Sequence, residues 1–277
     1  MKYLIPSTLT LGSILCGWYV ILCSLEGLQE FSNPERAAVF FNHASQAIGL
    51  AIILDNLDGR VARMIGATSL FGVELDSIAD ALTFGGASGV LVYTWGGNSI
   101  PGIWVPASCA TFIFIACGAL RLARSNLRAR SKRSDEASLN QEDAYFVGLP
   151  IPAAAGMLAA IVHFSSSPIG GRLATGAISV EEARLYALIV MSVTILLSLL
   201  MVSTFPYSKL KIHHRGGRSL SVVNRMVFPS IAIMIAVGVL LNSRWVVLIL
   251  ATLYIVHGPL LKFVRLFRRA ESPFPVA

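Results

Sequence analysis

Charged residues are scarce in this chain of 277 residues. Asp, Glu, Lys and Arg together make up 13% of it, hydrophobic residues make up 55%, and the mean hydropathy is +0.70. Soluble domains carry about 25% charged residues. Several apolar runs approach the roughly 20 residues that a helix needs to cross a bilayer. The composition therefore excludes an ordinary soluble domain and indicates a membrane protein.

Cysteine and histidine motifs for metal binding are also lacking. The four cysteines, Cys16, Cys23, Cys109 and Cys117, lie inside apolar runs and have neither CxxC nor Cys/His spacing. The five histidines show no ligand spacing either. The sequence thus excludes a zinc site and predicts structural thiols. No small-residue cleavage site follows the first apolar run, so we expect no cleavable signal peptide.

Hydropathy predicts an all-α fold, a polytopic membrane helix bundle with about eight transmembrane helices. The connecting segments contain turn-forming pairs such as Asn33-Pro34 and Gly170-Gly171. We expect a single membrane domain over residues 1–277. The predicted spans cover residues about 4–25, 37–57, 72–95, 103–123, 147–165, 184–205, 222–242 and 245–263.

The distribution of lysine and arginine predicts the orientation of the bundle. With the N-terminus in the cytoplasm, 18 of the 22 basic residues fall on the inner side of the membrane. The four exceptions are Arg36, Arg172, Arg184 and Arg244. Cytoplasmic loops carry the basic excess in membrane proteins, so both termini are predicted to be cytoplasmic, in the cell (inner) membrane. The net charge of +7 then suits anionic lipid headgroups and does not indicate nucleic acid.

The acidic residues are unevenly placed. Ten of the fifteen lie in loops or tails. The other five are at the ends of the second and third spans, where an ionisable group costs at least about 2.5 kcal/mol on insertion scales. Such residues indicate a functional site. They are Asp55, Asp58, Glu74, Asp76 and Asp80.

The spacing of four of these residues predicts one cavity. Asp55 and Asp58 are three apart and share a helix face, and Asp76 and Asp80 are four apart and share another. The link 64–69 is short enough to fold the two helices antiparallel. Four converging carboxylates would repel one another. Hard divalent cations relieve that repulsion, and two metals about 3.5–4 Å apart can share carboxylate ligands.

Small residues and one arginine accompany the carboxylates. Gly59, Ala62 and Gly72 are small enough to let a bulky phosphate ligand approach the backbone, and Arg63 offers a forked donor for phosphate oxygens. Two other interpretations stay open at this point. The acids can be satisfied helix-end charges paired with nearby arginines, or they can line a proton or cation pathway.

The complete pattern resembles the signature of the CDP-alcohol phosphotransferases, with every defined position at the right spacing. Those enzymes move a phosphatidyl or related group from a CDP-linked donor to an alcohol, release CMP, and use Mg²⁺ or Mn²⁺. The matching positions read Asp55-x2-Asp58-Gly59-x2-Ala62-Arg63-x8-Gly72-x3-Asp76-x3-Asp80.

The flanking segments are similar to those of one branch, the CDP-diacylglycerol–serine O-phosphatidyltransferases or phosphatidylserine synthases of the integral-membrane type. The similarity runs to about Lys209. It implies a six-helix core over 1–210 and an additional C-terminal helix pair over 211–277, to which we assign no chemistry. Ser125 departs from the aromatic residue expected there. The similar segments are IPSTLTLGSILCG, FGVELDSIADALTFG, ALRLARSN, VGLPIPAAAG and MVSTFPYSK.

The resemblance implies roles for the signature residues. Asp55, Asp58 and Asp76 would hold the metal that grips the CDP pyrophosphate. Asp80 would join a second metal and act as the catalytic base on the serine hydroxyl. CDP-diacylglycerol and L-serine would be the substrates, and phosphatidylserine and CMP the products. The CDP-lipid pocket would be lined by Asp55, Asp58, Gly59, Ala62, Arg63, Gly72 and Asp76.

Three basic residues outside the signature are predicted contacts for the serine carboxylate or a phosphate: Arg121, Arg124 and Lys209. Alternatively, these three residues are ordinary basic residues that anchor helix ends on the inner side of the membrane. Gly85 and Gly89 permit close helix packing, within a subunit or across the homodimer that the resemblance implies.

Two alternative functions stay open at this stage. The first keeps the reaction but changes the acceptor to glycerol 3-phosphate, inositol phosphate or choline. The second is an ion transporter that uses the carboxylate cluster.

Overall fold

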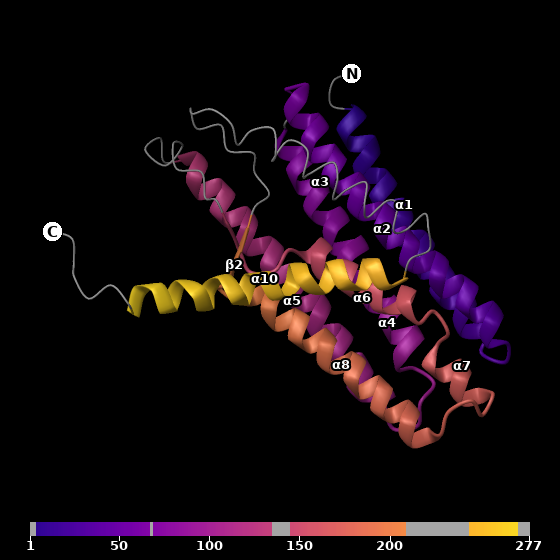
Figure 1. Ribbon diagram of the computed structural model, residues 1–277. Coiled ribbons are helices and arrows are strands. Elements are labelled where there is room, and N and C mark those ends of the chain that lie inside the picture. The colour runs from indigo at the N-terminus through magenta and orange to yellow at the C-terminus, as the bar shows by residue number, and fades with distance from the viewer. Residues whose placement is uncertain (1–3, 67–68, 135–144, 209–243, 271–277) are drawn as a thin grey trace.

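The computed structural model describes residues 4–66, 69–134, 145–208 and 244–270, which form a bundle of long helices (Figure 1). The two longest helices have 31 residues each. In chain order the elements are α1 (Leu4–Gln29), α2 (Pro34–Met64), α3 (Leu70–Asp80), the π-helix η1 (Ala81–Ala87), α4 (Ser88–Gly96), α5 (Trp104–Ser134), β1 (Tyr145–Val147), α6 (Ile151–Phe164), α7 (Ile169–Ala174), α8 (Val180–Val202), β2 (Pro206–Ser208) and α10 (Arg244–Ala270).

Within the described residues, six helical segments are long and apolar enough to cross a membrane. They confirm the first six predicted spans, and the chain is a multi-pass membrane protein. The six segments are Ser7–Gln29, Pro34–Ala62, Leu70–Gly96, Trp104–Arg128, Ile151–Ala174 and Val180–Val202.

The last two predicted spans have a different outcome. The seventh, 222–242, lies outside the described residues. The eighth, 245–263, falls in α10, whose apolar stretch Arg244–Leu260 is shorter than the six segments above. The total of eight spans and the position of the termini therefore stay predictions.

A short two-stranded sheet adds to the predicted all-α fold. β1 pairs antiparallel with β2, so that Phe146 faces Tyr207 and Val147 faces Pro206. Proline explains why helix does not continue through these segments. Pro206 has no N–H to donate, and Pro150 stands at the N-cap of α6 with an extended backbone. The sheet joins the segment that precedes α6 to the segment that follows α8.

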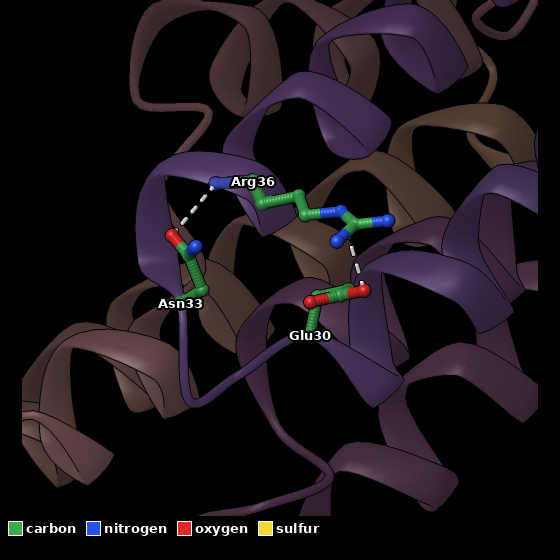
Figure 2. A network of polar contacts seen from close by, with 3 residues as sticks. All are labelled: Glu30, Asn33 and Arg36. Atoms are coloured by element: carbon green, nitrogen blue, oxygen red, sulfur yellow. Dashed lines mark hydrogen bonds and ion pairs between the residues drawn. The ribbon is translucent and has the colours of Figure 1, made fainter.

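A short turn sets α1 alongside α2. Asn33 precedes Pro34, the first residue of α2, and its side chain accepts a hydrogen bond of 3.2 Å from the backbone N–H of Arg36. The Arg36 guanidinium forms an ion pair of 3.3 Å with Glu30, at the end of α1 (Figure 2). Farther along, Gly27 leaves room for the fully buried ring of Phe41. The two helices therefore pack closely along their length.

Polar contacts show which helix ends meet at one end of the bundle. Thr10 of α1 bonds Asp58 near the C-terminus of α2. Asn126 near the C-terminus of α5 bonds Ser77 of α3. Arg124 of α5 bonds the last carbonyl of α8. We call this end, where α1, α3 and α6 begin and α2, α5 and α8 finish, the site end.

Candidate active site

Three carboxylates meet at the site end. Asp55 comes from α2, while Asp76 and Asp80 come from α3. One oxygen from each lies within 4.8 Å of the others, and all three side chains are half-buried. The carboxyl groups of Asp55 and Asp80 are close enough to hydrogen-bond. Clustered carboxylate oxygens are the ligands that Mg²⁺ and Mn²⁺ prefer, so this donor set fits a hard divalent cation.

Asp58 has a different environment. Its side chain is 5% exposed and accepts a hydrogen bond of 2.7 Å from the hydroxyl of Thr10. It is not part of the group of three. The structure thus brings together three of the four predicted metal ligands, and the role of Asp58 as a ligand stays a prediction. Thr10, which the spacing argument did not single out, orients it from α1.

The link between α2 and α3 explains why the two carboxylate faces meet. Gly66 has φ +63°, in the left-handed region that glycine adopts without strain. Ser69 then caps α3, because its hydroxyl accepts a 3.0 Å hydrogen bond from the N–H of Gly72. α3 therefore begins a few residues after α2 ends, and its residues Asp76 and Asp80 lie close to Asp55 of α2. The structure thus groups three of the four carboxylates whose convergence the spacing predicts.

The helix changes character directly after Asp80. η1 occupies Ala81–Ala87 and packs against α1. Thr83 donates a 3.1 Å hydrogen bond to the carbonyl of Ser13. Gly17 sits so close that an added Cβ would lie 2.8 Å from the Thr83 hydroxyl oxygen. π-Helical turns occur often at functional sites, and this one anchors the carboxylate-bearing helix to α1.

Arg121 is a buried cation within electrostatic range of the carboxylates. It belongs to α5, is 8% exposed, and interacts electrostatically with Asp80 and Asp55. A buried guanidinium needs such partners, because an uncompensated charge is costly in a region of low dielectric constant. The structure therefore places Arg121 at the predicted site.

Arg124, one turn later on α5, has structural partners. Its guanidinium donates to the carbonyl of Val147 at 2.9 Å, to that of Met201 at 3.1 Å, to that of Val202 at 2.8 Å and to that of Ser203 at 3.3 Å. These bonds tie α5 to β1 and to the end of α8. Its prediction as a substrate contact is not tested, but the structure gives it another role.

The small residues of the signature differ in what surrounds them. A Cβ added at Gly59 would meet no atom within 4 Å, whereas one at Gly72 would lie 3.2 Å from the Ser69 hydroxyl. Packing within the described part of the chain therefore does not require glycine at position 59. Ala62 is half-buried on the same helix. The side chain of Arg63 and all of Lys209 lie outside what the structure describes.

A groove of about 310 Å³ lies between α3 and α5. Its polar end is formed by Glu74, Ser77 and Asn126, and Asn126 donates a 2.9 Å hydrogen bond to Ser77. Asp55, Asp76 and Asp80 are not among the residues that line it. The groove is thus not the space between the three carboxylates.

Comparison with known proteins places the chain in a family. The sequence model of the CDP-alcohol phosphatidyltransferases matches residues 3–200. The chain therefore belongs to the CDP-alcohol phosphatidyltransferase family. The match contains all four signature aspartates and ends before α10.

Curated relatives share one name, CDP-diacylglycerol–serine O-phosphatidyltransferase. The protein of Helicobacter pylori (strain ATCC 700392 / 26695) is 36% identical over 154 residues, which cover 55% of this chain and 54% of the relative. That of Bacillus subtilis (strain 168) is 35% identical over 169 residues, covering 61% and 80%. That of Methanocaldococcus jannaschii is 40% identical over 130 residues, covering 47% and 55%. The chain thus spans about half the length of the first and third of these relatives.

Proposed function

We propose that this protein transfers a phosphatidyl group from CDP-diacylglycerol to the hydroxyl of L-serine, giving phosphatidylserine and CMP. Family membership supports the reaction class, and the relatives' shared name supports serine as the acceptor. The observation that carries the proposal is the meeting of Asp55, Asp76 and Asp80 at one end of a membrane bundle.

In this proposal Asp55, Asp76 and Asp80 hold divalent Mg²⁺ or Mn²⁺, with Asp58 as a further ligand and two ions per active site. When bound, such cations neutralise charge on the pyrophosphate of the donor and on the departing CMP. Gly59, Ala62, Arg63 and Gly72 line the nucleotide pocket. The open space at Gly59 supports this assignment, because a phosphate can approach the backbone there.

Asp80 is proposed as the catalytic base. A serine hydroxyl is a weak nucleophile until a nearby carboxylate accepts its proton during the attack on phosphorus. Asp80 is half-buried within the group and interacts electrostatically with Arg121. Arg121 is proposed to contact the serine carboxylate or a phosphate oxygen, since a guanidinium forms paired hydrogen bonds with either group. Arg124 and Lys209 were predicted to do the same, and for Arg124 the observed carbonyl partners favour a structural role.

The domain organisation, the orientation in the membrane and the oligomeric state are also proposed. Residues 1–210 form the six-helix core, and 211–277 contribute an additional helix pair. The site end faces the cytoplasm from the inner membrane, as the lysine and arginine distribution indicates. The protein acts as a homodimer, and the membrane lipids that surround it include its donor substrate.

An acceptor assay tests the proposal. Purified protein in detergent micelles receives CDP-diacylglycerol, Mn²⁺ and one labelled alcohol at a time: serine, glycerol 3-phosphate, inositol phosphate or choline. We expect lipid product and CMP when the alcohol is serine, and neither with the other three alcohols. Product from another alcohol and none from serine would show that the acceptor assignment is wrong. Absence of CMP with every alcohol would rule out the transferase reaction.

An Asp80→Asn variant tests the catalytic base. We expect turnover to be lost while CDP-diacylglycerol binding stays close to wild type, because the amide cannot accept the proton. Glu181→Gln is the matched control, since Glu181 is an exposed acid at the start of α8, at the opposite end of the bundle. Loss of binding together with turnover would make Asp80 chiefly a metal ligand. Ion flux through liposomes that survives the substitution would instead favour the transporter.

A further inference from the structure

One side of α1 contacts both of the helices that carry the aspartates. Thr10 donates a 2.7 Å hydrogen bond to Asp58 of α2. Ser13 follows three residues later, and its carbonyl accepts a 3.1 Å hydrogen bond from the hydroxyl of Thr83 in η1. Gly17, four residues farther on, approaches the same threonine. Because residues three and four apart lie on one side of a helix, the same side of α1 holds α2 and the helix formed by α3 and η1.

Thr83 is fully buried within the membrane-spanning segment Leu70–Gly96. A threonine hydroxyl inside a helix commonly bonds a carbonyl of its own helix. Thr94 of α4 does so, since it donates to the carbonyls of Val90 at 2.9 Å and Leu91 at 3.1 Å. The hydroxyl of Thr83 donates across to α1 instead. Hydrogen bonds are directional, so this one favours a single rotation of η1 relative to α1.

Gly17 brings the two helices into backbone contact at this point. A Cβ added to Gly17 would lie 2.8 Å from the hydroxyl oxygen of Thr83 and 3.0 Å from its Cα. The Cα belongs to the backbone and cannot turn aside as a flexible side chain can. Any side chain at position 17 would therefore push η1 away from α1. The hydrogen bond and the glycine together determine the rotation of η1 and its distance from α1.

The position of η1 is transmitted directly to two of the carboxylates. Asp80 is the last residue of α3 and stands immediately before η1, and Asp76 lies one turn earlier. One oxygen of each lies within 4.8 Å of an oxygen of Asp55, which belongs to α2. Rotating the helix would swing Asp76 and Asp80 together away from Asp55. Sites of this kind require their ligands to be placed within about 0.5 Å.

We propose that Thr83 is a positioning residue, which by its bond to the Ser13 carbonyl holds Asp76 and Asp80 in the orientation that meets Asp55. The inference rests on the proposed function, in which these carboxylates hold Mg²⁺ or Mn²⁺. Thr83 acts through the aspartates and contacts neither the metal nor the substrate. The role explains why a hydroxyl at this depth bonds α1 and not its own helix.

A Mn²⁺ titration followed by electron paramagnetic resonance tests the role in the full-length protein in detergent. The titration gives the number of sites and their dissociation constant separately. Thr83→Val removes the hydroxyl and keeps a branched side chain. We expect the dissociation constant to rise about tenfold, as for the loss of one buried hydrogen bond, with the number of sites unchanged. A purely structural role predicts the opposite, because unfolded molecules lower the number of sites and leave the constant of the others unchanged.

Three further variants complete the experiment. Thr83→Ser keeps the hydroxyl, and we expect it to restore the wild-type dissociation constant. Gly17→Ala moves η1 without touching the hydrogen-bonding groups, and we expect it to raise the constant as Thr83→Val does. Thr94→Val is the matched control, because it removes a buried hydroxyl from the same membrane-spanning segment whose bonds lie within its own helix. We expect this control to bind Mn²⁺ as the wild type does.

A raised dissociation constant in Thr83→Val and Gly17→Ala, with recovery in Thr83→Ser, supports the inference. An unchanged constant in either of the first two variants, or no recovery with serine, would overturn it. Failure of the wild-type protein to bind Mn²⁺ would overturn it together with the metal assignment. If the wild type binds Mn²⁺ but forms no lipid product from any alcohol, the proposed function fails. The dissociation constants then still decide whether Thr83 positions the carboxylates.

Discussion

Replacing Gly59 with alanine separates the stability of the fold from the function of the site. Gly59 lies inside α2, four residues after Asp55. Alanine is more favourable than glycine within a helix by about 1 kcal/mol. The new methyl group would meet no atom of the described chain within 4 Å. We therefore expect the free energy of unfolding to stay the same or to rise by up to about 1 kcal/mol.

The expected effect of Gly59→Ala on the substrate has the opposite sign. If the donor phosphates occupy the space over Gly59, the methyl group overpacks a filled site, which typically costs about 1–3 kcal/mol. This corresponds to a loss of about 5- to 150-fold in affinity for the CDP-lipid. The effect should fall on binding of the donor, while the KM for serine changes little.

The assay compares kcat/KM for CDP-diacylglycerol with the midpoint of thermal unfolding, both in the same detergent. Gly96→Ala is the control, because Gly96 is a helical glycine at the far end of α4 whose added Cβ would make an ordinary contact of 3.6 Å with Val190. We expect that variant to keep wild-type activity. A Gly59→Ala protein with unchanged stability and unchanged kcat/KM would refute the placement of the nucleotide pocket over this residue.

Two further substitutions test side chains that position the site. Thr10→Val removes the hydroxyl that donates to Asp58, and loss of one bond to a buried carboxylate costs roughly 1.5–3 kcal/mol. We expect kcat/KM to fall about ten- to hundredfold and Thr10→Ser to recover it; wild-type activity in Thr10→Val would contradict this role. Arg124→Lys leaves backbone carbonyls of α8 and β1 without a donor. This should lower the free energy of unfolding by about 2 kcal/mol. We expect the unfolding midpoint to fall by about 4–8 °C, whereas lost turnover at an unchanged midpoint would support the predicted substrate contact.

The meeting of Asp55 with Asp76 and Asp80 could be predicted from sequence because it depends on local geometry. Spacings of three and four residues define a helix face. The short link with Gly66 favours a reversal of the chain direction. The six apolar segments could be predicted equally well, since the length of a hydrophobic run is a property of the sequence alone.

The environment of Asp58 and the partners of Arg124 could not be predicted in this way. Both depend on which helices become neighbours, and Thr10 is separated from Asp58 by 48 residues. The position of a hydroxyl group in an apolar helix does not indicate which side chain it will hydrogen-bond. The hydrogen bond from the Tyr207 hydroxyl to the carbonyl of Ile255 in α10 is similar. Gly258 and Pro259 predict a weak or kinked helix, but they do not predict which side chain packs there. The two short strands are also defined only by their pairing.

The three carboxylates belong to helices that also cross the membrane, and this has a thermodynamic consequence for a lipid donor. Pulling a two-tailed lipid with roughly 30 methylene groups into water would cost on the order of 25 kcal/mol, at about 0.8 kcal/mol for each methylene. A headgroup that reaches Asp55, Asp76 and Asp80 from within the bilayer leaves its tails among neighbouring lipids. In the proposed reaction, the lipid reactant and product would then enter and leave laterally within the bilayer, without being extracted into water.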